Sequence, residues 1–201
     1  MVYADYKRER ASMTANLEKP TNPFHRIISL LRVGPRGLIL RFYDQFTRKR
    51  TGHPVWNLSR VRPFLYVGGQ HYPKGWHEVE KEGITGIINM REDYHDDNEL
   101  GVAGKAHLHL ATRDNTPVPL EYLHQSADFV AEHKANNGKV YVHCGVGVGR
   151  APSSAVAYFI KHENMTTVEA IATMREVRPF IHLTDSQRRQ LEKFELELRS
   201  S

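Results

Sequence analysis

The sequence predicts an α/β fold in which a central, mostly parallel sheet of about four to five strands is flanked by helices, with a basic helical extension before it. Three observations lead to this prediction. The chain has 201 residues, enough for one full core and an extension. From about residue 56, short apolar runs alternate with helical patterns, as in parallel α/β sheets. A glycine-rich turn joins one of these runs to a helix.

The amino-terminal part differs from the rest in charge. Residues 1–60 contain twelve Lys or Arg and four Asp or Glu, whereas residues 61–201 contain sixteen and nineteen, so the net charge of +5 comes from the amino-terminal part. We divide the chain into a leader and basic amphipathic helical extension, 1–55, and an α/β domain, 56–201. Apolar residues at helical spacing predict two short helices within 24–50. Their apolar faces either pack on the domain or make a peripheral contact with an anionic membrane or a partner.

Four apolar runs are the expected strands of the sheet. The first ends in Gly68-Gly69, the second has the composition of a fully buried strand, the third alternates through His107 and His109, and the fourth leads into the glycine-rich turn. Their expected ranges are 64–68, 84–90, 106–111 and 139–143.

Five helices are expected around these strands. Asn136-Asn137-Gly138 ends the longest of them, and Thr166–Glu169 and Thr184–Gln187 resemble capping boxes at two helix starts. The expected ranges are 75–81, 120–135, 151–162, 167–175 and 184–198.

The turn after the fourth strand has the pattern of a phosphate-binding catalytic loop. Cys144, the only cysteine, ends the strand, and Arg150 opens the next helix. Three glycines between them allow successive amides to point inward at a helix amino terminus, where an anion binds. The same positive potential favours the thiolate of Cys144, which is the nucleophilic form. Arg150 can bind two oxygens of a phosphoryl group. The expected phosphate-binding residues are Gly145, Val146, Gly147, Val148, Gly149 and Arg150.

A phosphoryl transfer to cysteine also needs an acid for the leaving oxygen. Asp114 is our candidate, because it lies thirty residues before Cys144, just beyond the carboxyl end of an expected strand. An Asx-turn or a helix cap before Pro117 is the structural alternative for this aspartate. Asp93, Asp96 and Asp97 follow another strand and compete for the role of acid.

The motif His-Cys-x5-Arg, with an aspartate about thirty residues upstream, resembles the cysteine-dependent dual-specificity phosphatases of the protein tyrosine phosphatase superfamily. The resemblance covers residues 57–198 and implies that Cys144 is the nucleophile, Arg150 the phosphate clamp, Asp114 the general acid and His143 the residue that orients the loop. This chain has Ala151 where the family usually has Ser or Thr, so we expect slow hydrolysis of the phosphocysteine. Gln187 is either a water-positioning residue or a helix-start residue.

The resemblance implies a phosphoprotein phosphatase that acts on phosphotyrosine and on phosphoserine or phosphothreonine through a phosphocysteine intermediate. Two alternatives remain. One is a membrane-associated lipid phosphatase of the phosphoinositide or phosphatidylglycerophosphate type, which the basic extension favours and the absence of Lys or Arg between Cys144 and Arg150 opposes. The other is a slow phosphopeptide-binding regulatory module, which Ala151 favours.

Composition adds expectations about cofactors and location. The twelve histidines do not cluster with cysteine at ligand spacings, so we expect no metal, and the proposed chemistry needs no cofactor. No nucleic-acid partner is expected, because the domain itself is not basic. The polar first ten residues and the lone thiol favour a reducing, cytoplasmic location, with peripheral membrane contact as the alternative. The sequence predicts no oligomeric state.

Overall fold

The computed structural model describes residues 58–92 and 105–200, together with residues 49–54 and the helical positions 39, 42, 43, 46 and 47. The chain divides into two compact units, Met1–Arg41 and Phe42–Ser201, and the second is described below. The predicted leader and most of the predicted helical hairpin lie outside the described residues, so the boundary at residue 55 remains a prediction.

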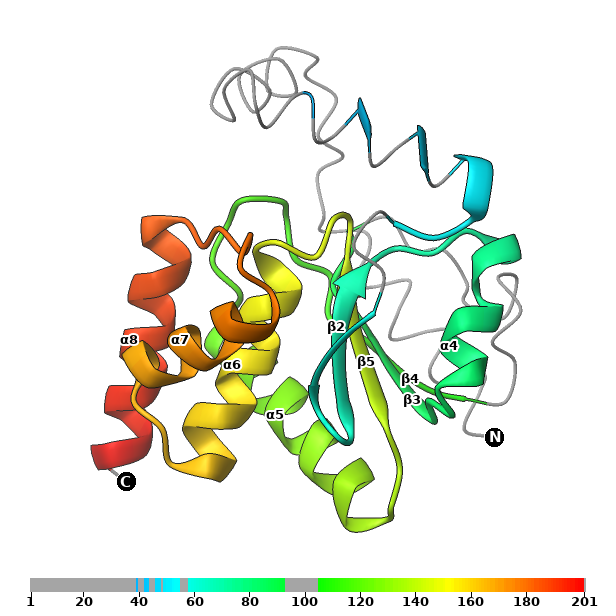
Figure 1. Ribbon diagram of the computed structural model, residues 1–201. Helices are drawn as coiled ribbons and strands as arrows, with labels where there is room; N and C mark the ends of the chain where they lie inside the picture. The colour runs from blue at the N-terminus through cyan, green and yellow to red at the C-terminus, as the bar shows by residue number, and fades with distance from the viewer. Residues whose placement is uncertain are drawn as a thin grey trace, which may run out of the picture. The chain divides into compact units, whose positions relative to one another are not determined.

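Five strands form one sheet in the order β1-β2-β5-β3-β4 (Figure 1). β2, β5, β3 and β4 are mutually parallel, and β1 is antiparallel to β2. The predicted mostly parallel sheet is therefore confirmed. The strand bounds are β1, Ser59–Arg62; β2, Leu65–Gly69; β3, Gly86–Asn89; β4, Ala106–His109; and β5, Val140–Cys144.

The edge strand β1 was not predicted. Its sequence, Ser-Arg-Val-Arg, has a single buried side chain, Val61, and therefore no apolar run that a pattern search detects. The strand forms because β2 offers it a free edge across a two-residue turn. The pairing of β1 with β2 thus depends on tertiary structure, because the local sequence of β1 does not predict a strand.

The helices agree with the predicted ones to within a few residues. The first predicted helix, 75–81, is α4, which begins two residues later than predicted because a separate 3-10 turn, η1, starts at Pro73 and ends at Gly75. Thr166 and Glu169 form the predicted capping box of α7. The bounds are η1, Pro73–Gly75; α4, His77–Lys81; α5, Leu120–Ala135; α6, Arg150–Glu163; α7, Thr167–Val177; and α8, Asp185–Ser200.

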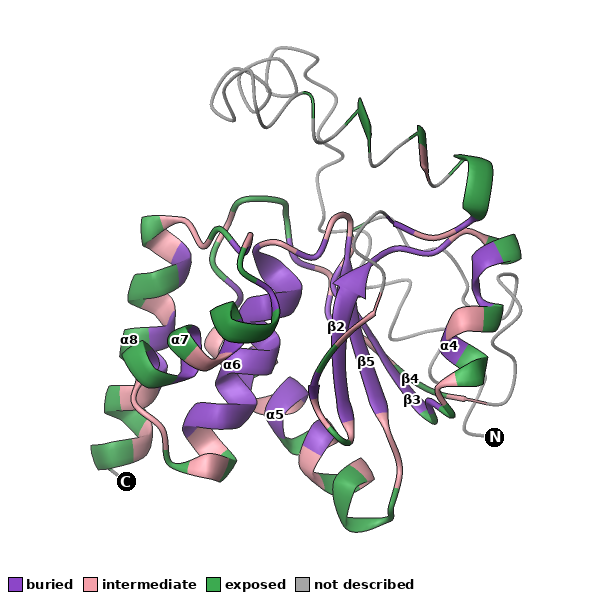
Figure 2. Cartoon of the chain, viewed as in Figure 1, coloured by how far each residue is buried: buried purple, intermediate pink, exposed green. Residues whose placement is uncertain are grey.

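The two faces of the sheet carry different layers. Helices α5 to α8 cover one face and α4 lies on the other (Figure 1). Side chains of successive residues in the central strands point to opposite faces of the sheet, and each face has its own hydrophobic core. Val140 and Val142 belong to the larger core, while Tyr141 packs with Trp76 and Ile87 in the smaller one. Helix α6 is buried along most of its length (Figure 2). It contacts β2, β5, α5, α7 and α8, so it is the central helix of the domain.

In the part of the chain that the structure describes, no helix is long and apolar enough to cross a bilayer.

Candidate active site

The loop between β5 and α6 lies at the carboxyl edge of the sheet, where parallel strands commonly gather ligands. Cys144 is the last residue of β5 and pairs with Gly69, the last residue of β2. The cysteine is 3% exposed. The backbone N–H of Gly147 donates a hydrogen bond to its sulfur at 3.2 Å. The predicted loop therefore turns at least one amide toward the thiol, which stabilises negative charge on sulfur.

The carbonyl groups of the loop are held on its outer side. Each of the five between Cys144 and Arg150 accepts a hydrogen bond from a group outside the loop. The donors are the backbone N–H of Gln70 to Gly145, the guanidinium of Arg178 to Val146 and Gly147, the backbone N–H of His182 to Val148, and Ser153 to Gly149. With its carbonyl dipoles engaged in this way, the loop presents amides to its inner side, as an anion site requires.

Gly147 is the position at which this conformation needs a glycine. Its φ of +76° lies in the left-handed region. A Cβ there would collide with the carbonyl of Gly68 and with the guanidinium of Arg178. Both the backbone angle and the close approach of β2 therefore exclude a larger residue.

Arg150 opens α6 and folds back over the loop. Its side chain is 8% exposed. Nη1 donates to the carbonyl oxygens of Thr112 at 2.7 Å and Met90 at 3.3 Å. The buried Nε has no hydrogen-bond partner. An unused N–H on a buried guanidinium is a group that an added phosphate oxygen would satisfy.

Asp114 lies at the mouth of the same site. Its Oδ1 is 3.2 Å from Nη2 of Arg150, and its side chain is 56% exposed. The structure thus brings together two residues that are thirty-six positions apart in the chain. Asn115, with φ of 62°, makes the turn that follows. The competing Asp93, Asp96 and Asp97 lie outside the described residues.

His143 is fully buried beneath the loop. Its ring stacks on Tyr141 with centroids 5.5 Å apart, and it makes an edge-to-face contact with Trp76 with centroids 6.0 Å apart. Ala151 is also fully buried and follows Arg150 in the first turn of α6. Both residues adjoin the loop, and their roles in catalysis stay predictions.

Gln187 lies at the start of α8, and its role in positioning water stays a prediction. Thr184 and Gln187 form reciprocal bonds at the start of α8, as in a capping box. The amide of Gln187 also donates to the carbonyl of Thr116, two residues beyond Asp114, at 3.0 Å. A Cβ on Gly149 would lie 3.1 Å from its Oε1. The residue is thus a helix-start residue that also touches both catalytic loops.

Arg178 organises the loop, although its sequence context predicts no role for it. It is fully buried. Nε donates to Gly147 at 2.7 Å, Nη2 to Val146 at 3.2 Å, and Nη1 to the hydroxyl of Ser59 at 2.8 Å. An arginine directly after a helix and before Pro179 carries no local signal of burial, so only the tertiary structure identifies it.

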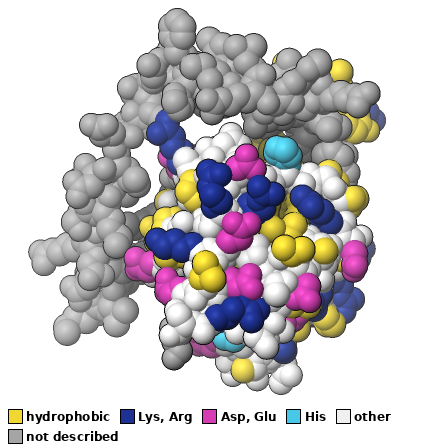
Figure 3. All heavy atoms as spheres, turned by 90° about the vertical axis from the view of Figure 1, so that its left-hand side faces the viewer, with side chains coloured by type: hydrophobic (Ala, Val, Ile, Leu, Met, Phe, Trp, Pro, Cys, Tyr) yellow, Lys and Arg dark blue, Asp and Glu magenta, His cyan; other side chains and the backbone are white. Residues whose placement is uncertain are grey.

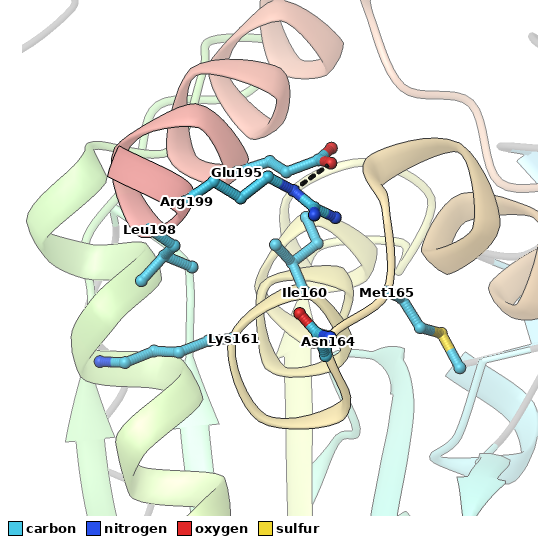
Figure 4. Close-up of a pocket in the computed structure, with 7 residues that line it drawn as sticks. All are labelled: Ile160, Lys161, Asn164, Met165, Glu195, Leu198 and Arg199. Carbon is cyan, nitrogen blue, oxygen red and sulfur yellow. Dashed lines mark hydrogen bonds and ion pairs between the residues drawn. The ribbon is translucent and has the colours of Figure 1, made fainter. Parts of the chain in front are cut away.

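A separate small pocket of about 140 Å³ lies at the other end of α6. Figure 4 shows its lining, which includes the ion pair between Glu195 and Arg199. Ile160 and Asn164 also line it, and they are at least ten residues along the helix from Arg150. None of the predicted site residues contributes to this pocket.

Comparisons with known proteins agree with this geometry. Residues 65–197 match the family described as "Dual specificity phosphatase, catalytic domain". The chain is 34% identical over 127 residues to mouse phosphatidylglycerophosphatase and protein-tyrosine phosphatase 1, covering 60% of this chain and 66% of the relative. It is 27% identical over 140 residues to the phosphatidylglycerophosphate phosphatase PTPMT2 of Arabidopsis thaliana. This match covers 68% of this chain and 61% of the relative. The matches thus span less than two thirds of these relatives.

Solved structures show the same fold. The crystal structure of PTPMT1 is similar with a TM-score of 0.65 and 28% identity, covering 71% of this chain and 96% of that one. The structure of PTPMT1 in complex with PI(5)P has a TM-score of 0.66 and 26% identity, covering 71% and 97%. With its sheet order, its Cys-x5-Arg loop and the match over residues 65–197, the chain belongs to the dual specificity phosphatase catalytic-domain family of cysteine-dependent phosphatases.

Proposed function

We propose that this protein hydrolyses phosphate monoesters through a phosphocysteine intermediate, with Cys144 as nucleophile, Arg150 as phosphate clamp and Asp114 as general acid and base. The observation that carries the proposal is the meeting of three groups at one loop. The thiol accepts an amide hydrogen bond, the guanidinium has an unused donor, and the carboxylate lies against that guanidinium. This is the set of groups that phosphoryl transfer to sulfur requires.

In the first step, the Cys144 thiolate attacks phosphorus while the bond from phosphorus to the ester oxygen breaks. Protonated Asp114 gives its proton to the departing oxygen. Nε of Arg150 and the loop amides stabilise the charge on the three equatorial oxygens. Before this step Arg150 exchanges its contact with Asp114 for the phosphate, which leaves the aspartate free to face the leaving group.

In the second step, water attacks phosphorus and the sulfur leaves as a thiolate. The carboxylate of Asp114 now accepts the proton from water. Gln187, which contacts Thr116 and lies beside Gly149, is the residue we assign to orient this water. Ala151 offers no hydroxyl to the departing sulfur, so we expect the second step to limit turnover.

The substrate we favour is a phosphoprotein carrying phosphotyrosine or phosphoserine and phosphothreonine. A second candidate is a lipid with a single phosphate monoester. It is favoured by the mouse relative, whose name includes both phosphatidylglycerophosphatase and protein-tyrosine phosphatase. The uncharged loop between Cys144 and Arg150 suits one phosphate in either case. Cytoplasmic location, with peripheral membrane contact through residues 24–50, is part of this proposal.

The test is rapid-mix kinetics with two soluble substrates, an aryl phosphate with a good leaving group and an alkyl phosphate with a poor one. We expect no turnover from Cys144→Ser. Asp114→Asn should slow the alkyl ester by about 10²- to 10⁴-fold, and the aryl ester much less, because only the poor leaving group needs the proton. Asp128→Asn, which removes an aspartate on α5, is the matched control and should retain full activity.

The outcomes separate the enzyme from its alternatives. Equal slowing of both esters by Asp114→Asn would contradict its role as acid. Phosphate binding without a burst or turnover would favour the regulatory binding module. If the enzyme turns over, specificity constants for a phosphotyrosine peptide and for a lipid monophosphate then distinguish the two substrate classes.

A further inference from the structure

The segment just before the sheet displays an apolar face to solvent. Positions 42, 43, 46, 47 and 49–51 are helical. Phe42, Tyr43 and Phe46 share one face by their spacing, and they are 70%, 59% and 63% exposed. Three large aromatic side chains at this exposure on one helical turn form an apolar patch of the kind that marks an interaction site.

Basic residues accompany this aromatic face. Lys49 and Arg50 are exposed on the same helix. Over residues 24–50 the sequence contains seven Lys or Arg and one acidic residue, Asp44. Aromatic side chains next to a cluster of positive charge suit an interface that is apolar within and anionic at its surface. An anionic bilayer has both properties.

The helix is joined to the domain by a defined contact. It ends at Gly52, whose φ of +88° gives the left-handed turn typical after a helix. The carbonyl of Gly52 accepts a hydrogen bond from the N–H of Tyr72 at 2.6 Å. The ammonium group of Lys74 donates to the last helical carbonyls, those of Lys49 and Arg50, the latter at 2.6 Å. Gly75 packs so closely on Gly52 that a Cβ on either would collide with the other.

This contact is made by the connection that borders the active site. Residues 70–75 follow β2 directly. At the start of that connection, the N–H of Gln70 donates to the carbonyl of Gly145 in the catalytic loop at 3.2 Å. Four residues later, Lys74 holds the helix. The aromatic helix is therefore attached to the same edge of the sheet as Cys144.

The helical face on the other side of the domain lacks this character. Figure 3 shows acidic and basic side chains interspersed over the face that carries α7 and α8. Helix α8 alone contains four of each sign. Such a surface gives no net attraction to an anionic layer.

We propose that the 42–51 helix is an interfacial anchor that binds an anionic lipid surface, and that Lys74 fixes it so that the active site faces that surface. The inference rests on the proposed phosphatase function and deepens it: the anchor directs the enzyme to phosphate monoesters displayed at a membrane, whether on lipid headgroups or on bound proteins. The aromatic face enters the headgroup boundary while the basic residues bind the anionic headgroups.

The binding test uses the full chain with vesicles of phosphatidylcholine, with and without phosphatidylserine, in a sedimentation assay. We expect wild type to bind the mixed vesicles, and to bind them less at high salt. Phe42→Ser with Phe46→Ser should weaken binding by about tenfold for each phenylalanine removed. Leu196→Ser is the matched control, because Leu196 is 68% exposed on α8 and should not contribute.

The activity test compares a lipid monophosphate in those vesicles with a soluble aryl phosphate. The Phe42/Phe46 double variant should lose vesicle turnover and keep soluble turnover. Lys74→Met should still bind vesicles but hydrolyse the embedded ester several-fold more slowly, because the anchored domain is no longer oriented.

Three results would overturn the inference. One is that the Phe42/Phe46 double variant binds the vesicles as well as wild type does. Another is an absence of vesicle binding together with a change in sedimentation coefficient on Phe42 and Phe46 substitution, which would show that a second copy covers the face. The third is unchanged vesicle turnover in Lys74→Met, which would refute the orienting role. If wild type does not hydrolyse the soluble aryl phosphate, the phosphatase proposal is refuted instead. The vesicle-binding assay would still test whether the helix is an anchor.

Discussion

Replacement of Arg178 by methionine should loosen the catalytic loop without touching any reacting group. The side chain is fully buried, and its guanidinium donates to the carbonyls of Val146 and Gly147, the hydroxyl of Ser59 and, at 3.4 Å, the carbonyl of Val67. Methionine has a similar length and fills much of the volume, but it donates nothing. The variant therefore tests hydrogen bonding rather than packing.

The expected loss of stability follows from the carbonyl groups that lose their hydrogen-bond donor. Two loop carbonyls lose their partner, and an unsatisfied buried group costs about 1–3 kcal/mol. Removal of the buried charge offsets part of this cost. We expect a net loss of roughly 2–4 kcal/mol in the free energy of unfolding. If the loop relaxes by about 1 Å, the rate of phosphoryl transfer falls by about 10²-fold. Arg178→Lys, which can serve Gly147 but not Ser59 as well, should be intermediate.

The assay combines urea denaturation, kcat and KM for an aryl phosphate, and competitive inhibition by inorganic phosphate. A positioning role predicts weaker phosphate inhibition together with lower kcat, whereas a purely structural role would lower stability alone. Arg175→Met, an exposed arginine on α7, is the control and should match wild type. An Arg178→Met variant with the phosphate affinity and kcat of that control would refute the reasoning.

Four further results are expected. Ala151→Ser should raise steady-state turnover after an unchanged burst, because the added hydroxyl stabilises the departing thiolate; a faster burst would contradict this in stopped-flow traces. Gln187→Ala should slow the steady state more than the burst, and a loss confined to thermal stability would leave the residue with its capping role alone. Gly147→Ala should abolish phosphate binding measured by calorimetry and lower the urea midpoint, since the left-handed backbone costs about 1–2 kcal/mol before the collision is counted. Burial raises the pKa of Asp128, but hydrogen bonds from Lys161 and His162 outweigh burial and hold that pKa below its usual range. These hydrogen bonds therefore stabilise the folded protein at pH values above the ordinary aspartate pKa. This stabilisation is lost as the pH falls through the lowered pKa of Asp128 in the folded protein. Because the Asp128 side chain is 55% exposed, Asp128→Asn should cost only about 0.5 kcal/mol near neutral pH, and a denaturation series should show this difference vanish in acid.

Apart from β1, the strands and helices of the domain were predictable because their signals are local. The apolar run of β5, the glycines after it and the capping residues of α7 each depend on neighbours within a few positions. The ends of elements differ from the predicted ones by a residue or two, and the helix predicted from Gly75 begins at His77, after a 3-10 turn that starts at Pro73. Local patterns do not define such ends sharply.

The residues of the candidate site also differ in how far local sequence predicts them. Cys144, Gly147 and Arg150 lie within seven residues, and the strand, the glycines and the helix start around them predicted one loop; their catalytic roles stay predictions. Asp114 needed the additional argument that parallel strands bring their carboxyl ends to one edge, and its contact with Arg150 agrees with that argument. Its role as acid stays a prediction until leaving-group dependence is measured. For Gln187 the sequence offered two separate roles; its bonds with Thr184 support the helix-start role, and its role in positioning water stays a prediction.

The sequence by itself determined the order of the four parallel strands and of the helices and predicted the catalytic loop, because periodicity and short motifs act over short stretches of chain. Only the tertiary structure decided which distant residues support that loop. β1 has no apolar run and forms by pairing with β2. Arg178 reaches the loop from the end of α7, and Lys74 reaches back twenty-four residues to the end of the 42–51 helix. These contacts depend on where elements meet in space, and a chain's local pattern does not encode that position.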